Sequence, residues 1–259
     1  MRQVRLEVCV DTPDGLDVAV ASGSDRIELC SSLISGGLTP SLGLMIRAAA
    51  VACPVRVMIR PREGDFTYSA AEVEMMVRDI EAVAELGLEG VVMGANRPGG
   101  ELDETVLRRL LDHATAAGLR TTLHRSFDLV PDLAAALVIA SDLGFDSLLT
   151  SGGEPDAVSG LDALRGLVTK AHRDGRRIEI MAGVGISSKT VRAIVERTGV
   201  DWVHGSCSRP RPAASPNALR LGYASPRHRV TDGGEIVRLQ RVLAAMAEVA
   251  ETGPRVNIE

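Results

Sequence analysis

Three cysteines of this chain lie in or just after short apolar segments that are typical of buried strands: Cys9, Cys30 and Cys207. Soft thiolate and thioether ligands select copper(I) or zinc, and Met58 and Met181 would add sulfur nearby. The chain has no Cys-x-x-Cys pair, however, and buried cysteines are usually small hydrophobic residues. A soft-metal site and simple packing are therefore both open, whereas Cys53, which precedes Pro54, is expected only to pack.

Five polar residues near the ends of other strand-like segments suggest acid–base chemistry: Glu28, Arg60, His124, Asp128 and His204. Carboxylates and imidazoles are the usual groups for moving protons. We expect Glu28 and Arg60 to form an ion pair across neighbouring strands, which would either serve a site or only fix the strand register. We expect Asp128 either to orient His124 or to bind substrate.

Glycine-rich turns predict an anion site. The segment MAGVGISSKTVRAI contains Gly183 and Gly185 and runs into a helical pattern, TSGG contains Ser151 and Gly152, and HGS ends at Ser206. Backbone N–H groups at such turns bind anions, and barrels often bind phosphate after strands seven and eight. The alternative is that these turns only let the chain bend sharply.

These residues need a scaffold, and the chain alternates strand-like runs with helical patterns. The runs are RLEVCV, RIELC, VRVMIR, GVVMGA, RTTLHR, SLLTS, IEIMAG and WVHGS. Such alternation predicts parallel strands with right-handed crossovers, and eight units close a (β/α)₈ TIM barrel of about 250 residues. An open sheet would favour a G-x-G-x-x-G motif after the first strand, and VCVDTPDG has none.

Side chains alternate between the two faces of a strand, which predicts the barrel interior. On the first three strands the inward positions are occupied by Glu7, Cys9 and Asp11, by Arg26, Glu28 and Cys30, and by Met58, Arg60 and Arg62. A barrel interior normally holds branched aliphatic side chains. Polar groups converging from several strand ends therefore predict a site at the C-terminal face.

Capping residues predict where the helices begin. We expect helix starts after Thr12, Ser69, Asp103, Asp132 and Ser187, and another at Leu161. The whole chain, 1–259, is expected to be one barrel domain. Residues 206–234 are predicted to form a long proline-rich loop or arm before a closing helix at 235–251. The arm is either a solvated connector or a segment that packs against another subunit of a homo-oligomer.

Composition excludes several classes of protein. A net charge of −5 and 2% aromatic residues argue against nucleic-acid binding. No apolar run reaches the roughly 18 residues of a membrane span, and the first residues lack the pattern of a signal peptide. Four cysteines are too few for a disulfide scaffold, so we expect reduced thiols and a cytoplasmic protein.

Several motifs in order along the chain resemble the copper homeostasis protein CutC family: LEVCVD, DRIELCSSLISGGLTPSLG, VMIRPREGDFTYS, TLHRSFD, LTSGG and VHGS. The resemblance implies a TIM barrel, copper(I) binding in which Cys9 and Cys30 match the family's cysteines, and a polar cleft. The cleft residues it implies are Glu28, Arg60, His124, Asp128 and His204. Glu63 departs from the family, which usually has glycine there.

We therefore expect a cytoplasmic copper(I)-binding protein with no organic cofactor. The alternative is a barrel enzyme that acts on a small anionic metabolite, including phosphorylated ones, with His124 or Glu28 as the acid–base group. A third interpretation is a scaffold whose barrel has lost its activity.

Overall fold

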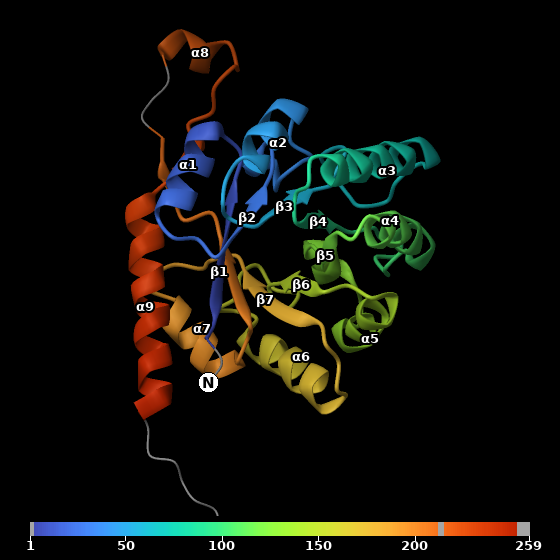
Figure 1. The fold of residues 1–259 in the computed structure, drawn as a ribbon, viewed down its shortest axis with the longest axis vertical. Helices are drawn as coiled ribbons and strands as arrows, with labels where there is room; N and C mark the ends of the chain where they lie inside the picture. The colour runs from blue at the N-terminus through green and yellow to red at the C-terminus, as the bar shows by residue number, and fades with distance from the viewer. Residues whose placement is uncertain (1–2, 212–214, 253–259) are drawn as a thin grey trace, which may run out of the picture.

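In the computed structural model, which describes residues 3–211 and 215–252, eight parallel strands form a closed barrel (Figure 1). The strands follow chain order, and β8 pairs with β1 to close the ring. Their bounds are β1 Arg5–Val10, β2 Arg26–Leu29, β3 Val55–Met58, β4 Gly90–Met93, β5 Arg120–Leu123, β6 Ser147–Thr150, β7 Glu179–Gly183 and β8 Trp202–Gly205. The predicted (β/α)₈ barrel is confirmed.

Helices surround the barrel, and most begin at the predicted caps. They are α1 Pro13–Ala21, α2 Leu42–Ala49, α3 Ala70–Glu85, α4 Glu104–Ala116, α5 Leu133–Leu143, α6 Leu161–Arg173 and α7 Val191–Thr198, with short 3₁₀ turns η1 Leu33–Ser35 and η2 Arg125–Leu129. Ser69 and Glu72 form the predicted capping box. Helix α2, which Ser41 caps, was not predicted.

The predicted start of α7 at Ser187 is wrong. The helix begins at Val191, because the Ser187 amide donates instead to the Thr190 hydroxyl and forms a turn ahead of the helix. Thr190, the residue before the helix, makes no side-chain cap hydrogen bond, so the hydroxyl residues in this segment did not mark the helix start.

The expected alternation of faces holds on the first two strands. Leu6, Val8 and Val10 are fully buried in the hydrophobic core that includes the helices. Glu7 and Arg26 are also buried, but they pair with each other inside the barrel. On the third strand the prediction fails at Arg62, whose half-exposed side chain pairs with Glu72 and Asp65 outside the strand.

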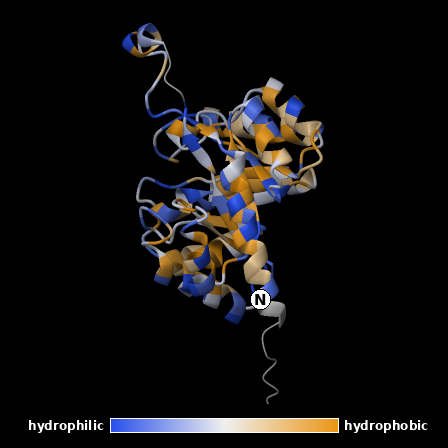
Figure 2. Ribbon diagram, turned by 90° about the vertical axis from the view of Figure 1, so that its left-hand side faces the viewer, coloured by the Kyte–Doolittle hydropathy of each residue, from blue (hydrophilic) through white to orange (hydrophobic). Residues whose placement is uncertain are grey.

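The C-terminal part departs from the βα repeat. Two short antiparallel strands, β9 Ser208–Pro210 and β10 Arg229–Thr231, carry a short helix, α8 Pro216–Arg220, which projects beyond the barrel (Figures 1 and 2). Helix α9, Gly233–Thr252, then runs along α1 and α7. Its residues Ile236, Leu239 and Leu243 are buried at helical spacing. Within the described ranges no helix is both long and apolar enough to cross a membrane.

Candidate functional site

A cavity of about 490 Å³ opens at the C-terminal ends of the strands. Its lining comes from most of the strand ends and the loops that follow them: Cys9, Glu28, Leu33, Ser35, Gly36, Met58, Arg60, Phe66, His124, Arg125, Leu149, Val184, Gly185, Ile186, His204, Gly205 and Ser206. This end of a (β/α)₈ barrel is where functional residues gather, because loop residues there are held by a rigid ring of strands.

His204 lies between two carboxylates at one side of this cavity. Its Nδ1 is 2.8 Å from Glu7 Oε1, and its Nε2 is 3.6 Å from Glu28 Oε2. Burial alone would lower the pKa of His204, but Glu28, Cys9 and Glu7 together raise it well above its ordinary value. The imidazole is therefore held as a cation.

The two carboxylates differ in character. Burial would raise the pKa of Glu7, but Arg26 and His204 outweigh it and lower this pKa to about 2. For Glu28 burial dominates, and Glu7 adds to it, so its pKa is raised although His204 opposes the shift. Glu7 is a permanent counter-charge, and Glu28 is a group that can gain and lose a proton.

Cys9 completes a compact set of donor atoms. The Cys9 sulfur, a Glu28 oxygen and a His204 nitrogen all lie within 4.8 Å of one another, and all three side chains are buried. The strand register explains this, since Cys9 is directly opposite Glu28 on β2, and His204 is opposite Glu7 on β8. Burial raises the pKa of the Cys9 thiol, although the His204 cation opposes the shift.

Of the three cysteines considered as soft-metal ligands, only Cys9 belongs to the compact donor set in the described part of the chain. Burial raises the pKa values of the Cys30 and Cys207 thiols, which also lie near enough to Cys9 for its charge to raise them further. Cys30 lies two residues beyond Glu28, and its thiol contacts Glu28 Oε2 at 3.5 Å. Cys207 follows the end of β8 with a positive φ of 42° and packs in the hydrophobic core. Burial raises its pKa to about 12.

The predicted ion pair between Glu28 and Arg60 is also wrong. The Arg60 guanidinium donates to three backbone carbonyls instead, those of Ser35 at 2.8 Å, Gly37 at 3.0 Å and Gly64 at 2.9 Å. These carbonyls belong to the loops after β2 and β3, which fold over the strand ends. Arg60 remains in the cavity wall but has no carboxylate partner among the residues that the structure describes.

His124 lies across the cavity and is neutral. Its Nδ1 accepts a hydrogen bond from the Ser126 amide at 3.1 Å, so the proton of the neutral ring is on Nε2. Burial and the nearby Arg60 cation lower the pKa of His124 to about 3. Its Nε2 is buried and has no hydrogen-bond partner among the residues that the structure describes.

Asp128 does not orient His124. Its carboxylate accepts hydrogen bonds from the amides of Ser151 and Gly153, from the hydroxyls of Thr150 and Ser151, and from Arg125. The Ser151 donors are thereby used inside the protein, and the Gly152 amide bonds to Thr150 Oγ1 at 2.9 Å. Asp128 therefore fixes the loop after β6, and Ser151 and Gly152 do not line the cavity.

The other predicted anion-binding residues divide. Gly185 and Ser206 line the cavity, whereas Gly183 does not, and a side chain there would meet Leu149 at 2.6 Å. Val184 lies in the same cavity wall with a φ of +70°. Positive φ is a true outlier for a β-branched residue, and such strain concentrates at functional sites.

Sequence reasoning did not include Glu7, Arg26 or Phe66 among the site residues. The signal for Glu7 was available, since it is two positions from Cys9 and so faces the same side of β1. Arg26 pairs with Glu7, and its guanidinium lies 3.8 Å from the centre of the Trp202 ring. Phe66 lies outside any strand, and no alternation pattern could have placed it.

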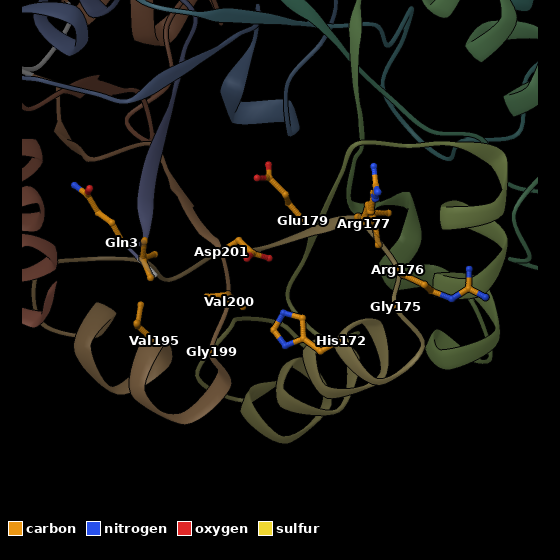
Figure 3. Close-up of a pocket in the computed structure, with 12 residues that line it drawn as sticks. Gln3, His172, Gly175, Arg176, Arg177, Glu179, Val195, Gly199, Val200 and Asp201 are labelled. Atoms are coloured by element: carbon orange, nitrogen blue, oxygen red, sulfur yellow. The ribbon is translucent and has the colours of Figure 1, made fainter. Parts of the chain in front are cut away.

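A larger cavity, of about 730 Å³, lies at the opposite, N-terminal end of the barrel (Figure 3). Figure 3 shows Glu179, Asp201 and Arg176 around it. Their polar groups already have structural roles: Asp201 accepts from the Ile180 amide at 3.0 Å, Arg176 pairs with Asp142, and Glu179 accepts from the Trp202 indole. This end of the barrel is therefore assigned to stability.

Known proteins resemble this chain along most of its length. The CutC family model matches residues 4–209. CutC family proteins of Sinorhizobium medicae and Caulobacter vibrioides (strain NA1000 / CB15N) are 49% and 48% identical to it, over 96% and 94% of this chain and 100% and 98% of their own. The solved structure of a Streptococcus agalactiae protein, provisionally named as copper homeostasis protein CutC, has a TM-score of 0.73 at 30% identity, over 78% of this chain and 98% of its own. The chain belongs to the CutC family.

Proposed function

We propose that this protein binds copper(I) in the cytoplasm, through Cys9 and His204, as part of copper homeostasis. The single observation that carries the proposal is the buried donor set of Cys9, Glu28 and His204, whose ligand atoms lie within 4.8 Å of one another. The name of the Streptococcus agalactiae protein supports the same role. Copper would then be the cargo of the protein and not a resident cofactor.

The donor chemistry fits copper(I). Thiolate sulfur and imidazole nitrogen are ligands that this soft ion accepts, whereas a carboxylate oxygen is a hard ligand. Glu28 is therefore expected to contribute mainly charge. Cys30, whose thiol contacts the same Glu28 oxygen, is the candidate for a second sulfur ligand, as the family resemblance implies.

The electrostatics also favour a monovalent cation at this position. The carboxylates of Glu7 and Glu28 already hold a proton on His204. A copper(I) ion on His204 Nε2 would replace that positive charge between the same two groups. Exchange of the His204 proton for copper(I) leaves the charge of the buried site unchanged. Release of the Cys9 thiol proton as well makes the site more negative by one charge.

The test is a copper(I) titration of the reduced protein against a chromophoric chelator, in the absence of oxygen. We expect one tightly bound ion per chain. Affinity should fall at least about a hundredfold in the C9S, C30S double variant and in H204Q, because even loss of an outer-shell partner costs up to about that much.

C53S is the matched control. Cys53 is a half-buried thiol that donates to the Ser24 carbonyl, far from the donor set in the strand register. Its loss should leave copper affinity unchanged. Equal affinities in the parent and the double variant would overturn the proposal.

A further inference from the structure

The cavity contains a buried cation that nothing in the described chain neutralises. Arg60 has only 6% of its surface exposed, and its guanidinium has five N–H donors. Three of these bind the carbonyls of Ser35, Gly37 and Gly64. Within the described ranges the buried Nε–H has no partner, and one N–H of Nη2 makes none of these three bonds. A buried charge of this kind is costly unless a partner of opposite charge joins it.

A second donor without a partner lies next to Arg60. The protonated Nε2 of His124 finds no acceptor in the described part of the chain, although the residue is only 3% exposed. Both side chains pack against Phe66, whose ring centre is 4.8 Å from that of His124 and 5.0 Å from the Arg60 guanidinium carbon, and all three line the same cavity. A ligand that fills the cavity can therefore contact both donors.

An acceptor lies in the same cavity wall. Glu28 Oε2 is engaged by His204 and Cys30, but Glu28 Oε1 is buried without a hydrogen-bond partner among the described residues. This oxygen is therefore free to accept a hydrogen bond from a hydroxyl group of a bound molecule.

We propose that this cavity binds a small monocarboxylate, whose carboxylate group Arg60 and His124 hold. One cation and one neutral donor match a single negative charge better than the two charges of a phosphate monoester. A volume of about 490 Å³ admits a compound of several carbon atoms and exceeds what a single ion needs. The strained backbone at Val184, in the same wall, is a further mark of a functional cavity.

Binding is tested by thermal unfolding of the metal-free protein with lactate, pyruvate, inorganic phosphate or lactamide, the neutral counterpart of lactate. Lactate or pyruvate in large excess should raise the melting temperature by about 2 °C or more, by mass action. Lactamide and phosphate should not. R60M and H124N should abolish the shift; H124N leaves the three carbonyl bonds of Arg60 in place and keeps an acceptor for the Ser126 amide.

R62M is the control for charge, since Arg62 lies two positions away with its side chain paired to Glu72 and outside the cavity. It should bind lactate as the parent does. An absence of stabilisation by both carboxylates would overturn the proposal, and so would an equal shift in H124N. Stabilisation by phosphate alone would replace the carboxylate with a different anion.

Carboxylate binding is measured by thermal unfolding of the metal-free protein, and copper affinity by chelator competition on the reduced protein. Failure of this proposal and failure of copper binding are therefore distinguishable.

Discussion

Glu7 and His204 face each other directly on neighbouring strands, and their side chains form a buried ion pair with 2.8 Å between Oε1 and Nδ1. Glu7 also pairs with Arg26 from β2, so one carboxylate joins three adjacent strands of the barrel. Through His204 it determines the charge beside Glu28 and Cys9. The acid that fixes the site is thus not itself part of the cavity wall.

Replacing Glu7 should destabilise the barrel strongly. In E7Q two buried cations, Arg26 and His204, lose their counter-charge, and breaking such a pair costs about 3–5 kcal/mol. Urea unfolding at pH 7 measures the free energy of unfolding of the parent and of each variant. The exposed pair of Arg192 and Glu196 provides the control, and E196Q should cost less than about 1 kcal/mol. Similar losses in both variants would contradict a special role for Glu7.

His124 should make the fold sensitive to acid. Its pKa falls from 6.5 to about 3 on folding, so the unfolded chain takes up a proton first as the pH falls. The contribution of neutral His124 to the free energy of unfolding is therefore fully present above pH 6.5 and is lost as the pH falls below that value. At pH 4.5 the loss is two pH units times 1.36 kcal/mol, or roughly 3 kcal/mol. The measurement is the free energy of urea unfolding of the parent and of H124N at pH 6.5 and at pH 4.5. H124N should lack the loss of roughly 3 kcal/mol that His124 causes in the parent.

The sequence predicts the barrel and much of the site because both follow from alternation. Alternation of side chains along β1, β2 and β8 places Cys9, Glu28 and His204 inside the barrel, and the strand register then brings them together. Alternation does not predict the partners of Arg60, which are backbone carbonyls of two loops. Every residue has a backbone carbonyl, so a sequence does not show which carbonyls will bind an arginine. An acidic residue such as Glu28 is visible in the sequence and was therefore predicted as the partner.

Cys207 and Asp128 show a second limit. Cys207 lies after the last strand residue, where a positive φ ends the alternation, so its side chain packs in the core. Asp128 sits in a segment rich in functional residue types, but its carboxylate is saturated by donors around the loop after β6. Residue type indicated chemistry in both cases, and the local backbone decided otherwise.

Copper(I) affinity should rise with pH. The pKa values of Cys9, Cys30 and His204 are all raised, so the apo site is protonated at neutral pH and copper must displace protons. The apparent affinity should therefore increase by about tenfold per pH unit for each proton released. Chelator competition at pH 6.5, 7.5 and 8.5 measures the slope. A flat profile would mean that the buried thiols and His204 are not ligands.

The arm formed by β9, α8 and β10 is expected to contact a second copy of the chain. It projects from the barrel (Figure 2) and exposes Leu219, Leu221 and Tyr223, the last of them 84% exposed. Burial of these exposed apolar side chains would stabilise a contact, and most soluble oligomers are homo-oligomers. Arg211 and His228 are joined by a backbone hydrogen bond of 2.9 Å, so residues 212–227 can be replaced by an Asn-Gly hairpin turn. Light scattering of this variant should then give the mass of one shortened chain, whereas the parent should exceed its 27.4 kDa chain mass.

L129S removes a leucine of the barrel that is as exposed as Leu221, and it should leave the assembly unchanged. A parent that is already monomeric at micromolar concentration would show that the arm has no such partner.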